Sequence, residues 1–325
     1  MSRRGPGCYS PQHMHVTFAW SPALLLFAYP HPVVASDVVA GLVLAVGLIV
    51  LLIRGEWLRA RGFDKLILLG PLSYALPIAA FGTEHYTLTR EIAPGVPAWM
   101  PWHIFWTYFV GTCLLLAAFS LVTGVHTRLA AALLGLMFFL FVLLMDAPGW
   151  FHQPTNRFAT ALMLREFSFS GGPLAFAVSL SANKGRLARS LAVVARWFVG
   201  VPILDYSYEQ FRHADHVPGI PLALVPPAWI HGHVLVTYLT AAVYLVAGPL
   251  VLLGWKPRLA ATAVGAMVLL GILAVYLPLG LVEHASMELG VNYPFDTLMY
   301  CGTVLLLAAA MPRDGERGTG VGTTV

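Results

Sequence analysis

The sequence predicts an all-α, polytopic membrane helical bundle of about nine transmembrane helices, with one leading helix and two parallel four-helix repeats. The first observation is composition: 58% of the 325 residues are hydrophobic, 10% are charged, and the mean hydropathy is +0.75. A soluble domain carries about 25% charged residues, so this chain could not cover its surface in water. The second observation is a duplication, because residues 97–148 recur at 227–278 with a constant offset of 130 and 18 identities. These include Pro-Ala-Trp, His, Thr-Tyr and Gly-x-x-x-Arg-Leu-Ala-Ala. Such a repeat sets the architecture.

The individual spans follow from hydropathy. Crossing about 30 Å of hydrocarbon takes about 20 apolar residues. Nine runs qualify, at about 33–53, 64–84, 103–123, 128–148, 158–182, 191–211, 233–254, 258–281 and 293–312. The chain then divides into an external N-terminal segment with the first span (1–63), a first repeat (64–182), a second repeat (190–312) and a cytoplasmic tail (313–325). Because each repeat holds an even number of helices, the copies are expected to be parallel, related by an axis along the membrane normal. Residues 16–31 are apolar but short and broken by proline, which indicates an interfacial segment or, alternatively, a tenth span.

The basic residues are unevenly distributed between the loops on the two sides of the predicted membrane. One set of alternate loops, with the C-terminal tail, holds 12 Lys and Arg, and the other set holds 5. The positive-inside rule therefore predicts an external N-terminus and a cytoplasmic C-terminus. The net charge of +4 is explained by this topology, so the expected surroundings are a lipid bilayer and no nucleic-acid partner is expected.

Eleven of the twelve histidines fall on or near the predicted outer side, together with most of the acidic residues. Glu84, followed by His85, ends the first helix of one repeat, and Glu209 ends that of the other, 125 residues later. Ionisable groups near the hydrocarbon are costly and tend to be functional, so these are candidate catalytic residues. The alternative is that each acid pairs with Arg90, Arg157 or Arg212 to fix a long loop.

His103 and His233 open the second helix of each repeat and keep the same register. Two imidazoles from parallel bundles could act as axial haem ligands or as hydrogen-bond donors to a quinone. The aromatic residues beside them are candidate cofactor contacts: Trp99, Trp229, Tyr108 and Tyr238. The alternative assigns the tryptophans to the aromatic belt of a membrane protein.

A candidate metal site lies at Glu209, His213 and His216, which stand at i, i+4 and i+7. If the helix continues for one more turn before Pro218, the three share a face and could bind Zn²⁺, Cu²⁺ or Fe²⁺. The alternative is interfacial histidines hydrogen-bonded to loop carbonyls.

Arg165, a further candidate catalytic residue, lies well inside the fifth span, where a guanidinium must pair or face a cavity. Adjacent helical residues point about 100° apart, so Glu166 is not expected to satisfy Arg165. The candidate partners on other helices are Asp146, Asp205 and Asp296.

The four-helix unit resembles the DoxX-like family of bacterial integral membrane proteins. The resemblance is carried by residues 64–71, Phe81-Gly-Thr-Glu-His and Val96-Pro-Ala-Trp-Met-Pro-Trp-His, with Gly124-x-x-x-Arg-Leu-Ala-Ala. It covers about 64–312 and implies a multi-pass protein of the bacterial inner membrane. That family includes a subunit of thiosulfate:quinone oxidoreductase, relatives that mature periplasmic redox enzymes, and distant cargo-receptor-like proteins.

The sequence therefore favours a membrane component of a redox system, linked to quinone, haem or a transition metal, with a polar site at the outer face. Its partner would be a periplasmic or membrane redox protein. One alternative is a non-enzymatic scaffold or maturation factor for a periplasmic partner, and another is a small-molecule transporter.

Overall fold

The computed structural model describes residues 31–183 and 185–313, and every regular element in these ranges is a helix. Of the segment at 16–31, all but its last residue lies outside the described residues, as does nearly all of the C-terminal tail. Eight helices in the described ranges are long and apolar enough to cross a membrane. The chain is therefore an all-α, multi-pass membrane protein, as the composition predicted.

The leading helix α2 (His31–Ile53) is followed by the short helix α3 (Glu56–Arg59) and then by the first repeat. Its first helix consists of α4 (Asp64–Leu68) and α5 (Gly70–Thr87), and a loop with α6 (Thr89–Ile92) and η1 (Ala93–Gly95) follows. The remaining helices of the repeat are α7 (His103–Thr123), α8 (Thr127–Phe141) with η2 (Val142–Asp146) and α9 (Ala147–His152), and α10 (Arg157–Ser179).

The second repeat has the same order of elements. They are α11 (Arg186–Arg212), α12 (His233–Leu253), α13 (Pro257–Gly271) with η3 (Ile272–Tyr276) and α14 (Leu277–Val282), and η4 (Met287–Asn292) with α15 (Tyr293–Ala310). From α7 to α9 every boundary recurs 130 residues later in α12 to α14, including the π-helical turns η2 and η3. The left-handed residues that start α8 and α13, His126 and Lys256, also match.

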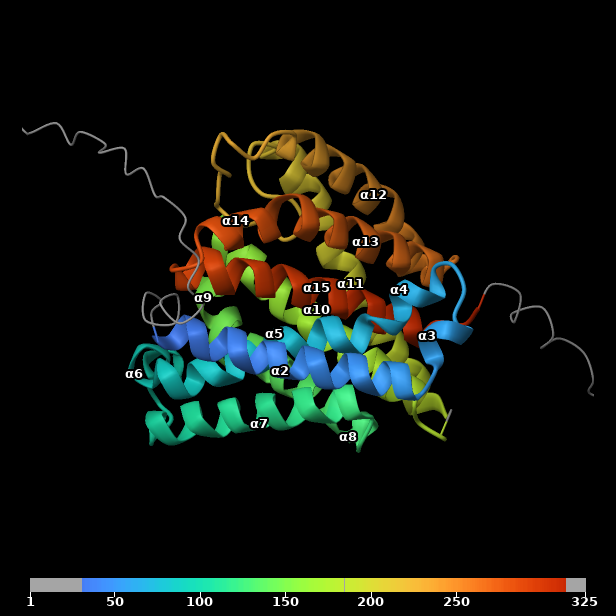
Figure 1. The fold of residues 1–325 in the computed structure, drawn as a ribbon, viewed down its shortest axis with the longest axis horizontal. Coiled ribbons are helices and arrows are strands. Elements are labelled where there is room, and N and C mark those ends of the chain that lie inside the picture. Colours follow the sequence, from blue (N-terminus) through green and yellow to red (C-terminus); the bar gives the residue numbers. More distant parts are fainter. Residues whose placement is uncertain (1–30, 184, 314–325) are drawn as a thin grey trace, which may run out of the picture.

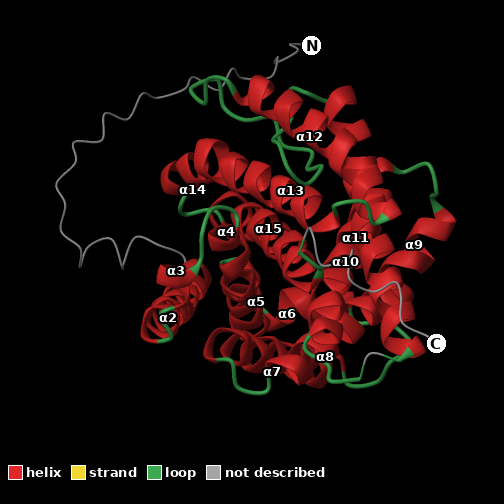
Figure 2. Ribbon diagram, turned by 90° about the vertical axis from the view of Figure 1, so that its right-hand side faces the viewer, coloured by secondary structure: helices red, strands yellow, loops and turns green. Residues whose placement is uncertain are grey.

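Helix α10 is the fifth expected span, and it is not among the eight helices that meet the length and hydropathy of a membrane span. It has 23 residues but falls short of the hydropathy of a membrane span, because it contains Arg165, Glu166 and a Ser/Gly run. Its neighbours are α8, α11 and α15, which surround it in the middle of the bundle (Figures 1 and 2). Since other helices enclose α10, its polar side chains are kept from the hydrocarbon.

The last helix of each repeat packs against the first helix of the other repeat at the centre of the bundle. Helix α15 of the second repeat packs on α5 of the first, while α10 of the first packs on α11 of the second, and α10 and α15 pack on each other. This reciprocal arrangement is what a two-fold axis between the repeats produces. Figure 2 shows α2 outside this core, packed against α5.

Close backbone contacts repeat across the axis. A Cβ on Gly302 of α15 would lie 2.4 Å from the backbone nitrogen of Tyr74, and one on Gly171 of α10 would lie 2.8 Å from the carbonyl oxygen of Ala195. Small residues allow helices to approach this closely in membranes. Next to these glycines, two matched hydrogen bonds join the helices, Ser170 Oγ to the Gly135 carbonyl at 2.7 Å and Cys301 Sγ to the Gly265 carbonyl at 3.4 Å.

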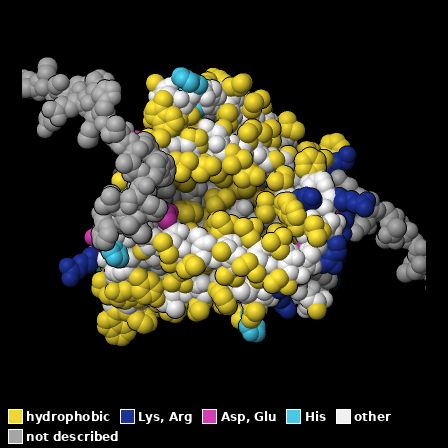
Figure 3. Space-filling view, viewed as in Figure 1, with side chains coloured by type: hydrophobic (Ala, Val, Ile, Leu, Met, Phe, Trp, Pro, Cys, Tyr) yellow, Lys and Arg dark blue, Asp and Glu magenta, His cyan; other side chains and the backbone are white. Residues whose placement is uncertain are grey.

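The two ends of the bundle differ in charge. Figure 3 shows Lys and Arg gathered at the end where α2, α7 and α12 finish, which we call the basic end. Its described basic residues are Arg54, Arg59, Arg61, Lys65, Arg128, Arg186, Arg189, Arg196, Lys256, Arg258 and Arg313. The opposite end is where α5 and α11 finish, and we call it the histidine end. Its described histidines are His31, His85, His103, His152, His213, His216, His231, His233 and His284.

Candidate functional site

An ion pair joins the repeats at the centre of the bundle. Arg165 Nη1 of α10 lies 2.6 Å from Asp296 Oδ2 of α15, and both side chains are largely buried. Arg165 lies eight residues into α10, which places it about 12 Å below the histidine end of that helix. The expectation that Arg165 pairs with an acid on another helix is confirmed, with Asp296 as the partner.

Glu166 also contacts the guanidinium, contrary to expectation. Its Oε1 accepts a hydrogen bond from Arg165 Nη2 at 3.0 Å. Adjacent helical residues point about 100° apart, but the Arg165 side chain is long enough to reach its neighbour. One guanidinium therefore lies between two carboxylates.

A cavity of about 320 Å³, which we call the first-repeat cavity, opens beside this ion pair. One part of its wall is aromatic and comes from three helices: Phe81, Phe138, Phe141 and Phe169. The other part is polar and consists of Glu84, His85, Arg165, Glu166, Asn292 and Asp296. The cavity thus combines an apolar wall with charged groups inside a membrane-spanning bundle.

Several polar atoms around this cavity are buried without a hydrogen bond among the described residues. They are Glu84 Oε1, Arg165 Nε, Glu166 Oε2 and Asn292 Oδ1. Buried polar groups are nearly always hydrogen-bonded, and each exception calls for an explanation. A bound polar molecule would supply the missing partners for both a donor and several acceptors.

In the second repeat three of the equivalent positions carry buried tyrosines, while Val268 and Gly271 stand in place of Phe138 and Phe141. Tyr206, Tyr244 and Tyr300 stand where the first repeat has Phe81, Leu114 and Phe169, and Tyr276 replaces Asp146. The ring of Tyr300 lies 5.4 Å from that of Tyr206 and 6.3 Å from that of Tyr244, centroid to centroid. The larger side chains occupy the interior of this copy.

Residues 213–232, which we call the plug loop, close the same copy at the histidine end. Gln210 donates a hydrogen bond to the Gly219 carbonyl at 3.0 Å and accepts one from the Gly219 N–H at 3.2 Å. Tyr276 donates to the Pro218 carbonyl at 2.8 Å, and Ile220 is buried in the core. In the first repeat, α6 and η1 take this place in the chain, and its cavity stays open.

A second cavity of about 420 Å³ lies on the other side of the ion pair. It shares Arg165, Asn292 and Asp296 with the first-repeat cavity, and the plug loop contributes residues 220–223 to its wall. The Arg165–Asp296 pair therefore lies between the two cavities.

A larger hollow of about 880 Å³ lies at the basic end, lined by Arg54, His126 and Arg128 beside apolar residues, far along the helices from the buried acids.

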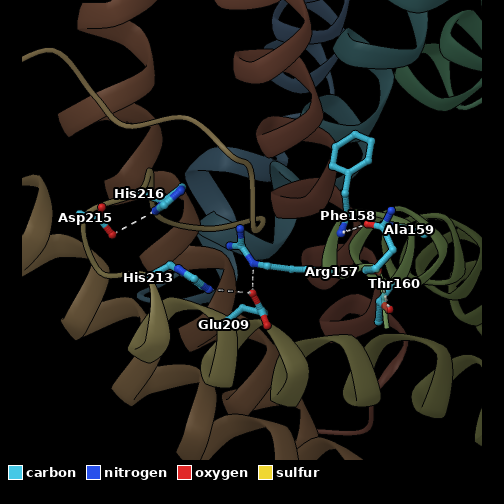
Figure 4. Close-up of polar contacts among 9 residues, drawn as sticks. Arg157, Phe158, Ala159, Thr160, Glu209, His213, Asp215 and His216 are labelled. Carbon is cyan, nitrogen blue, oxygen red and sulfur yellow. Dashed lines mark hydrogen bonds and ion pairs between the residues drawn. The ribbon is translucent and has the colours of Figure 1, made fainter. Parts of the chain in front are cut away.

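The two predicted glutamates have different surroundings. Glu209 forms an ion pair with Arg157 at the start of α10 and lies 4.0 Å from His213 (Figure 4). Glu84 lines the first-repeat cavity with its buried Oε1 free of hydrogen bonds. Glu209 therefore fits the interpretation in which the acid pairs with an arginine to fix a loop. Of the predicted catalytic residues, the first-repeat cavity brings together Glu84, His85 and Arg165.

His103 and His233 begin α7 and α12, but neither lines either of the cavities beside the ion pair. Their backbone carbonyls accept matched 3.0 Å hydrogen bonds from Thr107 and Thr237. The predicted aromatic contacts lie on the exterior, with exposed fractions of 71% for Trp99, 43% for Trp229, 41% for Tyr108 and 46% for Tyr238. These positions match an aromatic belt.

Two of the three predicted metal ligands, His213 and His216, lie close together just after α11, but the third member of the group is Asp215 and not Glu209. The helix ends at Arg212, because the hydrogen bonds between Gln210 and Gly219 turn the chain back, so His216 is not on its face. The turn instead brings together His213, Asp215 and His216, with one potential ligand atom of each within 4.8 Å of the others. Asp215 was not predicted, because no helical spacing places it on the same face as His213 and His216. Its hydrogen bond with His216 lowers the pKa of the Asp215 carboxyl.

Other residues of the first-repeat cavity were also missed, above all the four phenylalanines and Asn292. For Phe81 and Phe169 the only signal was the contrast with Tyr206 and Tyr300 at the equivalent positions of the second repeat, and Phe138, Phe141 and Asn292 carried none. No protein-family model, no curated protein and no solved structure matches this chain, so the function has to be inferred from this geometry.

Proposed function

We propose that the protein is a membrane component of a redox system and that it binds a quinone head group in the first-repeat cavity. One observation carries the proposal: a phenylalanine-lined cavity ends in buried polar atoms that lack hydrogen-bond partners, and three equivalent positions of the other repeat carry buried tyrosines instead. A quinone ring is flat and apolar on its faces and carries carbonyl oxygens at its edge. These features fit an aromatic wall with a polar end.

The residues have separable roles in this proposal. Arg165 offers its Nε–H to a carbonyl oxygen, and the pairs with Asp296 and Glu166 hold the guanidinium in place. Glu84 and Glu166 each present a carboxylate oxygen without a partner, so they can accept or return protons. Phe141 and Phe169 pack on the ring faces, since aromatic rings favour offset or edge contacts. When bound, a quinone supplies two-electron, two-proton redox chemistry.

The electrons would be exchanged with a periplasmic or membrane redox protein at the histidine end. We assign that end to the outer side because the opposite end carries the basic residues that favour the cytoplasm. This orientation puts the N-terminus outside and the C-terminus inside a bacterial inner membrane. Membership of the DoxX-like family is part of the same proposal and rests on the motifs and the four-helix units.

The test measures binding of a short-chain quinone to purified protein in nanodiscs, by quenching of tryptophan fluorescence. Leu114→Tyr introduces into the first-repeat cavity the residue that the second repeat has at the equivalent position, Tyr244, and is expected to abolish quinone binding. Leu116→Tyr, two residues further on the exposed face of α7, serves as the matched control and should bind normally. Equal binding by both variants would overturn the proposal. If the wild-type protein binds no quinone, the scaffold interpretation replaces it.

A second pair of variants tests the polar end. Glu84→Gln should weaken quinone binding because it alters a group with an unsatisfied oxygen in the cavity. Glu209→Gln changes the equivalent residue of the plugged repeat and should leave quinone binding unchanged.

A further inference from the structure

We propose that the turn after α11 binds a divalent transition-metal ion, Zn²⁺ in the first place, through His213, Asp215 and His216. The site lies at the histidine end of the second repeat and does not depend on the quinone proposal. Figure 4 shows Asp215 facing His216, and His213 directed toward Glu209, which Arg157 also contacts.

The spacing of the ligand atoms is close to that of a metal site. His216 Nδ1 lies 3.0 Å from Asp215 Oδ1, and all three ligand atoms lie within 4.8 Å of one another. Two ligands bound to a tetrahedral Zn²⁺ at about 2.0–2.1 Å are about 3.3 Å apart. The Asp215–His216 pair, now joined by a hydrogen bond, is near this separation, so an ion would replace the shared proton, and rotation of the half-buried His213 side chain would close the third position.

The ligand types narrow the choice of ion. Two imidazoles and one carboxylate form a common three-residue set for zinc, with a fourth position for water. Imidazole also binds Cu²⁺ and Ni²⁺, whereas Ca²⁺ and Mg²⁺ require sets made of oxygen ligands. The site is thus suited to zinc and its neighbours in the transition series.

The backbone of the turn is anchored on both sides. His213 N–H donates to the Glu209 carbonyl at 2.9 Å, and His216 N–H donates to the His213 carbonyl at 3.0 Å. Thr237 of α12 donates to the His216 carbonyl at 3.1 Å. Ala214 and Val217 are buried on either side of the exposed Asp215. Because the backbone is fixed before the ion arrives, little ordering is needed to bind it.

Glu209 acts as a positioning residue for this site. Its Oε2 lies 4.0 Å from His213 Nε2, an ion-pair distance that a small movement of the ring would shorten to a hydrogen bond, while Arg157 holds the same carboxylate from the start of α10. A carboxylate behind a metal-binding histidine orients the ring and raises its basicity, and its loss typically lowers metal affinity about 10–100-fold. The structure therefore predicts that Glu209 matters for metal binding although it is not one of the three ligands.

All three ligands lie within the first four residues of the plug loop, directly after α11, so a bound ion would brace the start of that loop. It would thereby stabilise the closure of the second repeat. The first repeat has Leu88 and Glu91 at the positions equivalent to His213 and His216, so it cannot form the same site.

The experiment uses full-length protein without a polyhistidine tag, stripped with a chelator and returned to nanodiscs. Equilibrium dialysis with Zn²⁺ should give one tight site per chain, and Co²⁺ substitution should give the visible absorption of tetrahedral cobalt. The double variant His213→Ala/His216→Ala should lose at least about 100-fold in affinity, because it removes two of three ligands.

The matched control, His152→Ala/His231→Ala, removes two exposed histidines from the same end and should bind as the wild type does. Asp215→Asn is nearly isosteric, so it tests the third ligand without altering the fold, and it should also weaken binding clearly. Unchanged affinity and stoichiometry in the His213/His216 double variant would overturn the proposal, as would equal losses in the control.

Discussion

Arg165 and Asp296 occupy equivalent positions, 131 residues apart in the two repeats, and their side chains form an ion pair at 2.6 Å. The same offset relates Ser170 to Cys301 and Gly171 to Gly302, whose contacts are also matched. Equivalent residues meet only near the axis that relates the copies, where two identical charges would repel. Opposite charges at this position turn the duplicated site into an attractive contact.

Replacing Arg165 by Leu should therefore destabilise the bundle. Removing one partner of a buried pair leaves the other charge uncompensated, at a cost of about 3–5 kcal/mol. The loss would appear as a lower melting temperature in detergent. Arg186→Leu, at the exposed start of α11, is the control and should melt like the wild type.

The two-fold relation leads to a stricter experiment on the same pair. Since the positions are equivalent, Arg165→Asp combined with Asp296→Arg should recover most of the stability that either single change loses. A double variant that is less stable than both single variants would contradict the two-fold arrangement.

The contact of Gly302 with α5 should tolerate no side chain. An added Cβ would lie 2.4 Å from Tyr74 N, so Gly302→Ala must push α15 away from α5. Overpacking of this kind costs about 1–3 kcal/mol or more. Gly41→Ala, where a Cβ meets no atom within 4 Å, should not lower the melting temperature.

The plug loop should depend on Gln210. Gln210→Ala removes two hydrogen bonds and leaves the N–H and carbonyl of Gly219 unpaired, each at about 1–3 kcal/mol. Hydrogen exchange of residues 217–224 is expected to become faster while α12 and α13 stay protected. Unchanged exchange would mean that Tyr276 and the buried apolar residues hold the loop without Gln210.

The orientation can be tested by labelling in intact cells. A cysteine at Trp102, between the spans at the histidine end, should react with a membrane-impermeant maleimide, whereas one at Arg186 should react only after lysis. The reverse pattern would place the first-repeat cavity near the cytoplasmic face.

Hydropathy and the repeat were sufficient to predict most helix positions, since both are carried by many residues. The predicted run 103–123 coincides with α7, and Asp296 was among the partners considered for Arg165. The different surroundings of Glu84 and Glu209 could not be predicted in this way. They depend on Arg157 and on the plug loop, whose path is set by contacts of Gln210 and Tyr276 with residues after the helix.

The group of metal-binding residues could not be predicted from helical spacing either. A helical period relates His213 to Glu209, but the chain leaves the helix at Arg212 and brings in Asp215, which no period connects to the others. The cavity was missed because phenylalanine in an apolar helix carries no distinctive signal until its neighbours in space are known.

The central claim, quinone binding in the first repeat, is tested most directly by photolabelling. A short-chain azidoquinone is bound to the protein in nanodiscs and irradiated, and the modified peptides are identified by mass spectrometry. We expect the label on residues around Phe81, Phe141 and Phe169, which line the cavity from α5, α8 and α10, with competition by unlabelled quinone. Label that is confined to the second repeat or the exterior helix faces, or that unlabelled quinone does not displace, would contradict it.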